Sequence, residues 1–252
     1  MAKDRVLITG MSGLIGGIMR QALEARYDLA ALNRRDVPGV RCHRADIGDF
    51  DAIRPAFDGV DIVIHLGAYA KITTPWEDIL HNNIVGTYNV LEASRQAGVR
   101  RVVFASSGSV IMRHELDAPY SQLVEGPDAP LPEDWSMITK LSPPRPEGLY
   151  GCSKAWGEVL GRHYSERHGL SVICVRIGAV VTDDKPLEPR HFSVWCSHRD
   201  VAQMLEKCMT APDDLDYDIF YAVSNNKRRY RDIEHAREVI GYEPQDSADD
   251  HR

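Results

Sequence analysis

The sequence lacks several features that would define its class at once. No apolar run is long enough to span a membrane, and there are no internal repeats or low-complexity tracts. Basic residues are not in excess, since 30 lysines and arginines stand beside 37 acids and the formal net charge is −7. This balance disfavours an extended nucleic-acid surface. We therefore expect neither a membrane nor a nucleic acid as a partner.

Cysteine is sparse and shows no metal-binding pattern. The five cysteines are scattered without the paired spacing of a zinc site (Cys42, Cys152, Cys174, Cys196 and Cys208). An odd, unclustered set indicates reduced thiols, and the sequence opens with a strand pattern rather than a secretory leader. We expect a cytoplasmic protein without a metal site, in which these thiols fill the core.

The sequence does contain a regular alternation of short apolar runs and amphipathic helical patterns. Its 252 residues are enough for one large α/β domain. The alternation predicts a doubly wound parallel sheet of the Rossmann type. We expect strands at 6–8, 28–32, 40–43, 60–68, 101–106, 170–177 and 219–223, and helices at 14–23, 50–57, 76–97, 149–168, 197–209 and 231–240.

The segment from about 111 to 147 does not follow this alternation. It is rich in proline and acids, with aromatic residues interspersed. A connection this long in a compact domain is usually functional or mobile, so we interpret it as a lid or substrate-side insertion, with a disordered surface loop as the alternative. We expect a single domain over 1–252, in which 178–252 includes a small substrate lobe.

The first expected strand ends in the glycine-rich turn Thr9-Gly10-Met11-Ser12-Gly13-Leu14-Ile15-Gly16. Gly10 permits a tight turn, Gly13 lets the backbone approach a pyrophosphate, and Gly16 lets the following helix pack closely on the strand. The N–H groups and the dipole at the start of that helix attract phosphate. We predict a dinucleotide site at this turn (Gly10, Ser12, Gly13, Leu14, Ile15 and Gly16), and an ordinary glycine-rich turn is the alternative.

The end of the second expected strand indicates which dinucleotide binds. An acid at this position usually holds the ribose 2′-hydroxyl of NAD, but this sequence has Asn33-Arg34-Arg35. Guanidinium groups suit a 2′-phosphate. We expect Asn33, Arg34 and Arg35 to contact the cofactor and NADP to be preferred over NAD, with solvated loop arginines as the alternative.

The fourth expected strand ends in small residues, Gly67 and Ala68, after His65 and Leu66. Small residues at the carboxyl end of a parallel strand leave room for a flat cofactor, so we expect Leu66, Gly67 and Ala68 to border it. No acid lies near His65 in the sequence. We therefore interpret His65 as a packed strand-end histidine rather than a catalytic base.

A tyrosine and a lysine form the second chemical pattern. Tyr150 and Lys154 share one face of the helix expected at 149–168, so the ammonium is predicted to lower the pKa of the phenol. Such a phenol suits an acid/base that moves a proton while hydride leaves an alcohol carbon. Tyr150 is the only tyrosine with a lysine four residues later, and it follows the strand that ends in Ser106 and Ser107.

Taken together, these motifs resemble the extended short-chain dehydrogenase/reductase superfamily, the NAD-dependent epimerase/dehydratase group. The resemblance covers nearly the whole chain and rests on the glycine-rich turn, Asp46-Ile47, His65-Leu66-Gly67-Ala68, Asn83-Ile84-Val85-Gly86-Thr87, Ser106-Ser107, and Tyr150 with Lys154.

That resemblance implies a catalytic tetrad. In it, Asn83 holds a water relay, Ser107 orients the substrate oxygen, Tyr150 is the acid/base and Lys154 contacts the nicotinamide ribose. The resemblance also implies that Asp46 and Ile47 bracket the adenine, that Ile177 borders the cofactor, and that the chain forms a homo-oligomer. Taken alone, Asn83 would be a helix-surface amide and Ser107 a loop hydroxyl.

Within this superfamily, the chain is similar to uronate dehydrogenases, which oxidise the anomeric carbon of a hexuronate to a lactone. The likeness rests on 148–154, 175–178 and 193–198. It implies that Arg176 faces the substrate and binds a carboxylate, with a structural arginine paired to an acid as the alternative.

The chain departs from uronate dehydrogenases beside the serine. Their Asn-His pair is Gly108-Ser109 here, and the serine of their loop after His65-Leu66-Gly67 is replaced by Ala70 or Lys71. We expect Ser107, Gly108 and Ser109 to contact the substrate, and the substrate itself to differ.

These patterns predict an oxidoreductase that moves hydride between NAD(P) and a hydroxyl or hemiacetal carbon. The expected substrate is a small sugar, sugar acid or similar polar alcohol, because little chain follows Lys154 to build the lobe that buries a nucleotide sugar. The alternatives are a sugar epimerase or dehydratase that retains its cofactor and a non-catalytic NADP-sensing protein on the same fold.

Overall fold

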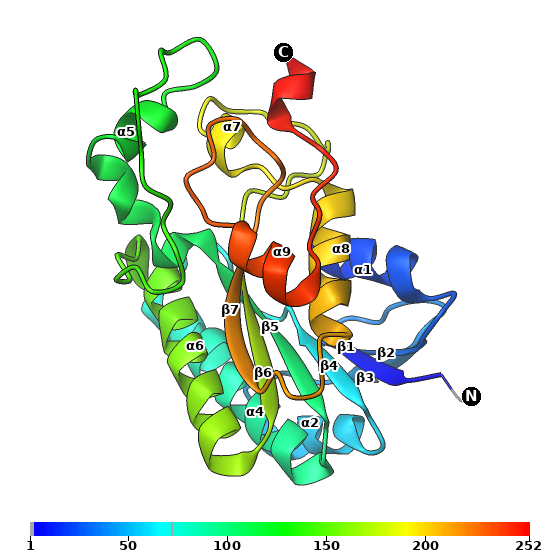
Figure 1. Ribbon diagram of the computed structural model, residues 1–252. Helices are drawn as coiled ribbons and strands as arrows, with labels where there is room; N and C mark the ends of the chain where they lie inside the picture. The colour runs from blue at the N-terminus through cyan, green and yellow to red at the C-terminus, as the bar shows by residue number, and fades with distance from the viewer. Residues whose placement is uncertain (1–2, 72) are drawn as a thin grey trace.

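The computed structural model describes residues 3–71 and 73–252 and is built around a seven-stranded parallel sheet (Figure 1). The strand order is β3-β2-β1-β4-β5-β6-β7, so the direction of winding reverses between β1 and β4. The expected doubly wound parallel sheet is confirmed. Its strands are β1 (Arg5–Thr9), β2 (Asp28–Asn33), β3 (Arg41–Arg44), β4 (Ile62–His65), β5 (Arg101–Ser107), β6 (Ser171–Ile177) and β7 (Tyr217–Ala222).

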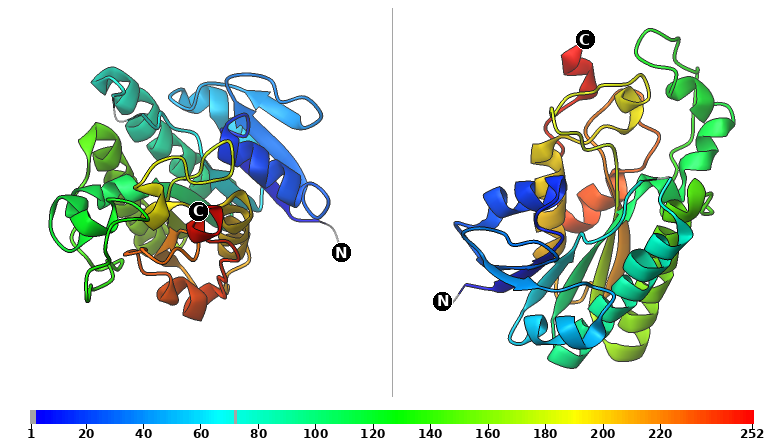
Figure 2. Two further views of the ribbon diagram at one scale, coloured as in Figure 1. Left: turned by 90° about the horizontal axis from the view of Figure 1, so that it is seen from above. Right: turned by 180° about the vertical axis from the view of Figure 1, so that it is seen from behind.

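Helices cover both faces of this sheet (Figures 1 and 2). One face carries α1 (Leu14–Leu23), α8 (His198–Met209) and α9 (Glu234–Ile240), and the other carries α2 (Phe50–Ile53), α4 (Gly86–Ala97) and α6 (Gly148–His168). Successive strand residues point to opposite faces, so Ile8 belongs to the first apolar core and Leu7 to the second. Burial on both faces explains why the strands are nearly continuous apolar runs.

The long helix α6 lies close to β5 and β6 because it has glycine at two of the points where it meets the sheet. A Cβ atom on Gly157 would lie 2.8 Å from Cε1 of Phe104, and one on Gly161 would lie 2.8 Å from Cγ1 of Val172. Close packing at the middle of α6 therefore sets the position of the helix relative to the sheet.

Two expected helices are interrupted. The helix expected at 76–97 consists of α3 (Trp76–Asp78), a π-helical stretch (Ile79–Val85) and α4, and the wide turns bury Asn82 and Asn83. The helix expected at 50–57 changes to a 3₁₀ helix after Ile53, where Pro55 has no N–H to donate. The other expected elements are present with small shifts at their ends.

The segment 111–147 packs on the rest of the chain, so the alternative of a disordered surface loop is wrong. It contains a 3₁₀ helix (Met112–Leu116) and α5 (Tyr120–Leu123), and Ile138 pairs with Arg231 in an isolated bridge. An apolar cluster joins it to α7 (His191–Val194), β7 and the C-terminal segment (Val110, Ile111, Leu123, Ile138, Val194, Tyr221 and Tyr230). In Figures 1 and 2 this layer lies beyond the carboxyl ends of the strands.

The segment 178–252 also contributes to the main fold. It supplies β7, which is the last strand of the sheet, and α8, which covers one face of the sheet. Within residues 3–71 and 73–252, no helix has the length and apolar character needed to cross a membrane.

Two adjacent glycines of α1 test this packing. A Cβ atom on Gly16 would lie 2.5 Å from Cα of Met11, whereas nothing lies within 4 Å of one on Gly17. Gly17→Ala is expected to stabilise the fold by roughly 0.5–1 kcal/mol, because glycine loses more entropy in a helix. Gly16→Ala is expected to cost about 1–3 kcal/mol by overpacking against backbone. Chemical denaturation measures both, and equal effects would contradict the close packing of α1 on the turn.

Candidate active site

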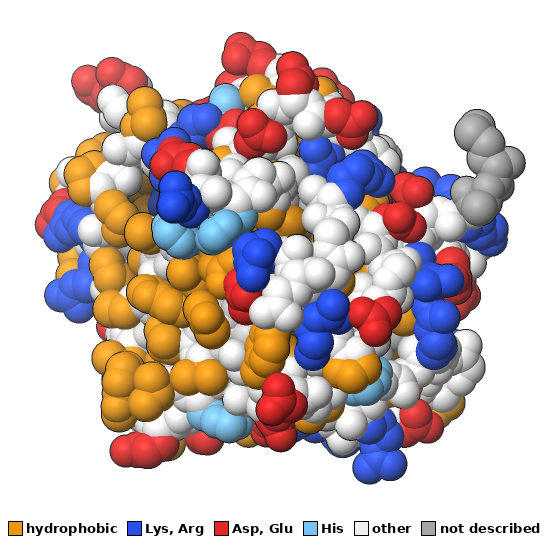
Figure 3. Space-filling view, turned by 90° about the horizontal axis from the view of Figure 1, so that it is seen from below, with side chains coloured by type: hydrophobic (Ala, Val, Ile, Leu, Met, Phe, Trp, Pro, Cys, Tyr) orange, Lys and Arg blue, Asp and Glu red, His pale blue; other side chains and the backbone are white. Residues whose placement is uncertain are grey.

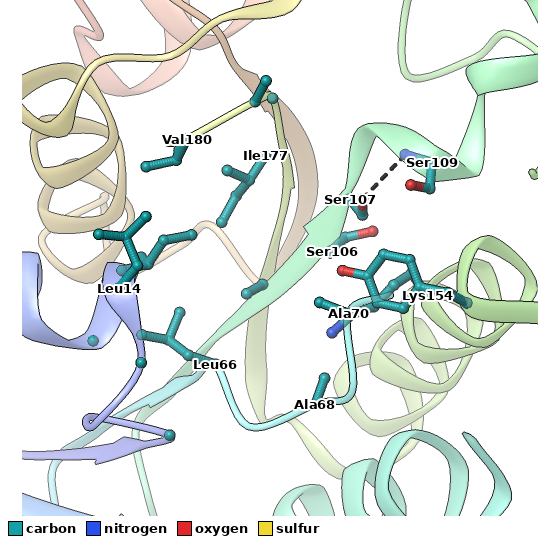
Figure 4. Close-up of a pocket in the computed structure, with 18 of the residues that line it drawn as sticks. Leu14, Leu66, Ala68, Ala70, Ser106, Ser107, Ser109, Lys154, Ile177 and Val180 are labelled. Carbon is teal, nitrogen blue, oxygen red and sulfur yellow. Dashed lines mark hydrogen bonds between the residues drawn. The ribbon is translucent and has the colours of Figure 1, made fainter. Parts of the chain in front are cut away.

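The carboxyl ends of the central strands surround a cavity of about 480 Å³ (Figure 4). The glycine-rich turn and the start of α1 line one side, and Ser106, Ser107, Ser109, Tyr150 and Lys154 line the other. Figure 4 shows Leu14 and Leu66 across the cavity from Ser107 and Lys154. The cavity lies beside the reversal of the strand order, which is where ligands bind in sheets of this kind.

A second cavity of about 220 Å³ continues the first toward β2. The two cavities share Gly10, Gly13, Leu66 and Ala68, so together they form one elongated groove across the turn. Nearly all the residues proposed for cofactor binding line this groove (Gly10, Ser12, Gly13, Leu14, Ile15, Gly16, Asn33, Arg34, Arg35, Ile47, Leu66, Gly67, Ala68, Tyr150, Lys154 and Ile177).

The turn has the backbone geometry that phosphate binding needs. Gly10 has a φ of 72°, and a Cβ atom there would lie 3.0 Å from the backbone nitrogen of Gly67. Helix α1 begins at Leu14 with Gly13 as its N-cap and no capping side chain. Its first N–H groups are therefore available to an anion at the entrance of the groove.

Asn33 supplies an independent sign of a ligand in the second cavity. Its side chain is 5% exposed, and neither amide atom has a hydrogen-bond partner among residues 3–71 and 73–252. Leaving a buried polar group unpaired costs roughly 1–3 kcal/mol, so a bound hydroxyl would relieve an existing deficit. Beside it, Arg34 donates a hydrogen bond of 2.9 Å to the hydroxyl of Tyr69 and stacks on that ring. These residues fit the ribose end of a dinucleotide.

Tyr150 and Lys154 lie on the first turns of α6, on the other side of the groove. The ammonium of Lys154 lies 5.8 Å from the ring centre of Tyr150 and 4.8 Å from that of Phe104. Burial lowers the pKa of Lys154 to about 8. No hydrogen bond from this ammonium to a described residue is present, which leaves it available to a ligand in the cavity.

The expected effect of Lys154 on the phenol is wrong for the protein alone. Burial raises the pKa of Tyr150 above its ordinary value, and hydrogen bonding with Ser107 only partly opposes this. The ammonium of Lys154 lies 5.8 Å from the ring centre, and desolvation of the phenolate is the largest cause of the raised pKa. The phenol is therefore protonated at neutral pH before a ligand binds.

Ser107 ends β5 and faces the cavity. Its hydroxyl oxygen accepts a hydrogen bond of 3.1 Å from the backbone N–H of Ser109, the contact drawn in Figure 4. Ser109 also lines the cavity, whereas Gly108 is buried and does not.

Asn83 lies inside the protein, and its expected role with a water relay stays a prediction. Asn83 is 1% exposed, and its oxygen accepts a hydrogen bond from the backbone N–H of Tyr69. Its amide nitrogen donates to the carbonyl of Tyr69 and to the hydroxyl of Ser153. Because both of its N–H groups are used inside the protein, Asn83 ties the loop after β4 to α6 and does not reach the cavity.

The expectation that Arg176 binds substrate is also wrong. Arg176 is 2% exposed and forms two hydrogen bonds of 2.8 Å with the carboxylate of Glu158 on α6. It also donates a hydrogen bond of 2.7 Å to the hydroxyl of Tyr221. The side chain lies between the sheet and α6, so the structural ion pair is the correct alternative.

Asp46 and His65 both have hydrogen-bond partners inside the protein. Asp46 does not line the groove, because its carboxylate accepts hydrogen bonds from the backbone of Gly48 and from His81. His65 is a packed histidine, as expected. Its ring bonds to Thr9 and Thr87, and burial lowers its pKa to about 3.

Sequence reasoning missed several lining residues. They include the four residues that follow β6 (Gly178, Ala179, Val180 and Val181). Ligands bind beyond the carboxyl ends of parallel strands, and applying this rule to β6 as well as to β4 could have found them. Tyr69 has no such signal, because its contact with Arg34 joins two separate loops.

The depressed pKa of Lys154 gives a stability prediction. Lys154→Met removes a buried charge, so it is expected to stabilise the protein without cofactor by up to about 3 kcal/mol at pH 7. The folded wild type loses its lysine proton near pH 8, below the ordinary lysine value of 10.5, so its stability rises with pH across this interval. The advantage of the variant should therefore shrink between pH 8 and 10.5.

Denaturation at pH 7 and pH 10 measures this change, with Lys185→Met at an exposed position as the control. A variant that is less stable than wild type at pH 7, or an advantage that does not change with pH, would contradict the buried ammonium.

The chain is similar to several sugar dehydrogenases. The chain is 37% identical to the NAD-dependent glucose-6-phosphate dehydrogenase of Haloferax volcanii, over 96% of this chain and 94% of that protein. It is 34% identical to the L-arabinose 1-dehydrogenase (NAD(P)(+)) of the same organism, over 97% of each. Among solved structures, a variant of uronate dehydrogenase from Agrobacterium tumefaciens complexed with NAD has a TM-score of 0.82 and 30% identity, covering all of this chain and 88% of that one.

A family model also matches most of the chain. It describes the NAD dependent epimerase/dehydratase family and matches residues 6–193. The match spans the glycine-rich turn, Ser107, Tyr150 and Lys154. The chain belongs to the NAD dependent epimerase/dehydratase family.

Proposed function

We propose that the protein oxidises or reduces a small sugar or sugar acid with a nicotinamide cofactor. The chain is an NAD(P)-dependent oxidoreductase that moves hydride to or from a hydroxyl or hemiacetal carbon. The observation that carries this is one groove that holds the glycine-rich turn and, opposite it, Ser107, Tyr150 and Lys154. The named activities of the three relatives support a sugar as the substrate class.

The residues divide the chemical work among them. Ser107 hydrogen-bonds the reacting oxygen of the sugar, and Tyr150 exchanges a proton with it. Lys154 contacts the ribose beside it and stabilises the phenolate, once a ligand brings the two groups into a polar network. When bound, the nicotinamide supplies the site for hydride. Leu14, Leu66 and Val180 form apolar walls that exclude water from the reacting groups.

Asn33 and the two arginines after it support a preference for NADP. The second cavity has no acid among its lining residues, and Arg34 and Arg35 stand at its edge. A ribose 2′-phosphate would meet two guanidinium groups instead of a carboxylate. The named relatives use NAD or either cofactor, so the proposed preference rests on this chain's own residues at the second cavity.

The surface supports a homo-oligomer. Tyr88 on α4 and Val159 on α6 are 47% and 71% exposed on neighbouring helices. Figure 3 shows hydrophobic side chains gathered on one side of the lower face, whereas acidic and basic side chains are mixed over the rest. We propose that a second copy covers this apolar side.

The five cysteines are all unpaired, which supports the cytoplasm as the compartment of the protein.

The segments 111–147 and 178–190 form the proposed substrate side of the groove. Val180 and Val181 line the cavity, and Glu115 in the first segment pairs with Arg190 at the end of the second.

An epimerase on the same fold would return the hydride to the sugar, so net reduction of the cofactor distinguishes a dehydrogenase from an epimerase.

Tyr150→Phe tests the proton transfer. The variant keeps the ring but loses the hydroxyl, so turnover should fall by at least about 100-fold while cofactor affinity stays within roughly twofold. Tyr164→Phe on the same helix is the matched control, because its hydroxyl bonds Glu92 away from the groove. The measurements are NAD(P)H absorbance with a panel of aldoses and uronates, and cofactor titration. Undiminished turnover of Tyr150→Phe would rule out its role.

Arg34→Ala and Arg35→Ala test the cofactor preference. Each should weaken NADP by roughly five- to tenfold and NAD by less than twofold, because only NADP carries the 2′-phosphate. Arg41→Ala on β3 is the control, since Arg41 does not line the second cavity. Equal losses for NAD and NADP would refute the assignment.

A further inference from the structure

A buried charge cluster around Glu115 lies behind Ser107, and none of its residues lines the cavity. Glu115 forms two hydrogen bonds with Arg190, of 2.5 Å to Nε and 2.7 Å to Nη2. Tyr230 donates its hydroxyl to the same carboxylate, and Nη2 of Arg231 lies 3.8 Å from it. These residues come from the 111–147 segment, the start of α7 and the loop after β7, so the cluster joins the parts that surround the proposed substrate side.

Arg231 lies directly against the backbone of Gly108. A Cβ atom on Gly108 would lie 2.5 Å from both Cζ and Nη2 of Arg231. The guanidinium therefore fills the space that a side chain at position 108 would take, between Ser107 and Ser109, which both line the cavity. Any larger residue at 108 would displace it.

The hydrogen-bonding capacity of Arg231 is mostly unused. Arg231 is 1% exposed, and its Nε has no partner among residues 3–71 and 73–252. Its one hydrogen bond there is a long contact of 3.4 Å from Nη2 to the hydroxyl of Tyr230. A buried guanidinium usually has most of its five N–H groups paired, so this one has donors left for an oxygen-bearing ligand.

The cluster also carries an unbalanced charge. Burial alone would raise the pKa of Glu115, but Arg190 and Arg231 hold it below its ordinary value, so the carboxylate is ionised. Arg190 donates hydrogen bonds to both carboxylate oxygens of Glu115. The charge of Arg231 is therefore only partly neutralised. Two guanidinium groups and one carboxylate leave a net charge of +1 in a site of low dielectric constant.

We propose that Arg231 is a specificity-determining residue of the substrate site. Its guanidinium binds an oxygen substituent of the sugar beside Ser107, and it binds a carboxylate or phosphate better than a hydroxyl. This assignment rests on the proposed function, because it needs a sugar at Ser107. A purely structural role for Arg231, as a brace for Gly108, makes a different prediction.

The test uses substitutions that change the charge of the cluster in opposite directions. Arg231→Met removes a positive charge and Glu115→Gln removes the negative one. Arg228→Met is the matched control, since Arg228 is also buried in the same loop but donates to backbone carbonyls of Gln122 and Ala129. The readout is kcat/KM for D-glucuronate or D-glucose 6-phosphate divided by kcat/KM for D-glucose, with the full-length enzyme and saturating NADP.

Arg231→Met should lower this ratio by about tenfold, mainly through KM, and Glu115→Gln should raise it. Arg228→Met should leave it unchanged, and Arg231→Lys should recover part of it because the charge is retained. Equal losses in Arg231→Met and Glu115→Gln, or an unchanged ratio in a folded Arg231→Met, would overturn the proposal.

The two proposals fail in different ways. Wild-type protein that turns over none of these sugars would count against the proposed function. In that case, the increase in melting temperature that D-glucuronate or D-glucose 6-phosphate causes still tests Arg231. The assignment is supported when Arg231→Met loses this increase and Arg228→Met keeps it. An increase that is retained in Arg231→Met contradicts the assignment.

Discussion

The ion pair between Glu158 and Arg176 holds the candidate site together. Glu158 lies one helical turn after Lys154 on α6, and Arg176 lies on β6. The same carboxylate accepts a hydrogen bond of 2.6 Å from Ser106, the neighbour of Ser107 on β5. Both charged side chains are nearly fully buried, so removing one partner alone would cost about 3–5 kcal/mol. The pair therefore fixes the helix that carries Tyr150 and Lys154 against the strand that carries Ser107.

Two polar groups that lack partners among the described residues lie in the groove. Asn33 is unpaired at one end, and Lys154 bears a buried ammonium at the other. By contrast, the buried His65 and Asn83 have their hydrogen bonds met inside the protein. Unmet polar groups reduce stability, and natural proteins keep them where a ligand will meet them. Their positions mark both ends of one dinucleotide-sized groove.

The sequence predicted the sheet and the groove well, because both depend on local patterns. Apolar periodicity identifies the strands and helices, and the glycine-rich turn and the spacing of Tyr150 and Lys154 need no distant partner. The roles of Asn83 and Arg176 depended on distant partners, Tyr69 and Glu158, which no spacing reveals. Alternation along β6 did contain a clue, because Val175 and Ile177 face the first core and Arg176 therefore faces α6. Similarly, nothing near Gly108 in the sequence indicates that Arg231 lies against it.

The reaction assigned to the groove is hydride transfer between a sugar carbon and the cofactor, with Tyr150 exchanging the proton. The most direct test is an incubation with an aldose or uronate that carries deuterium at its hemiacetal carbon, followed by NMR of the cofactor and the sugar product. Deuterium should appear on the nicotinamide ring in proportion to the sugar oxidised. Deuterium that stays with the sugar while the sugar is converted would contradict it.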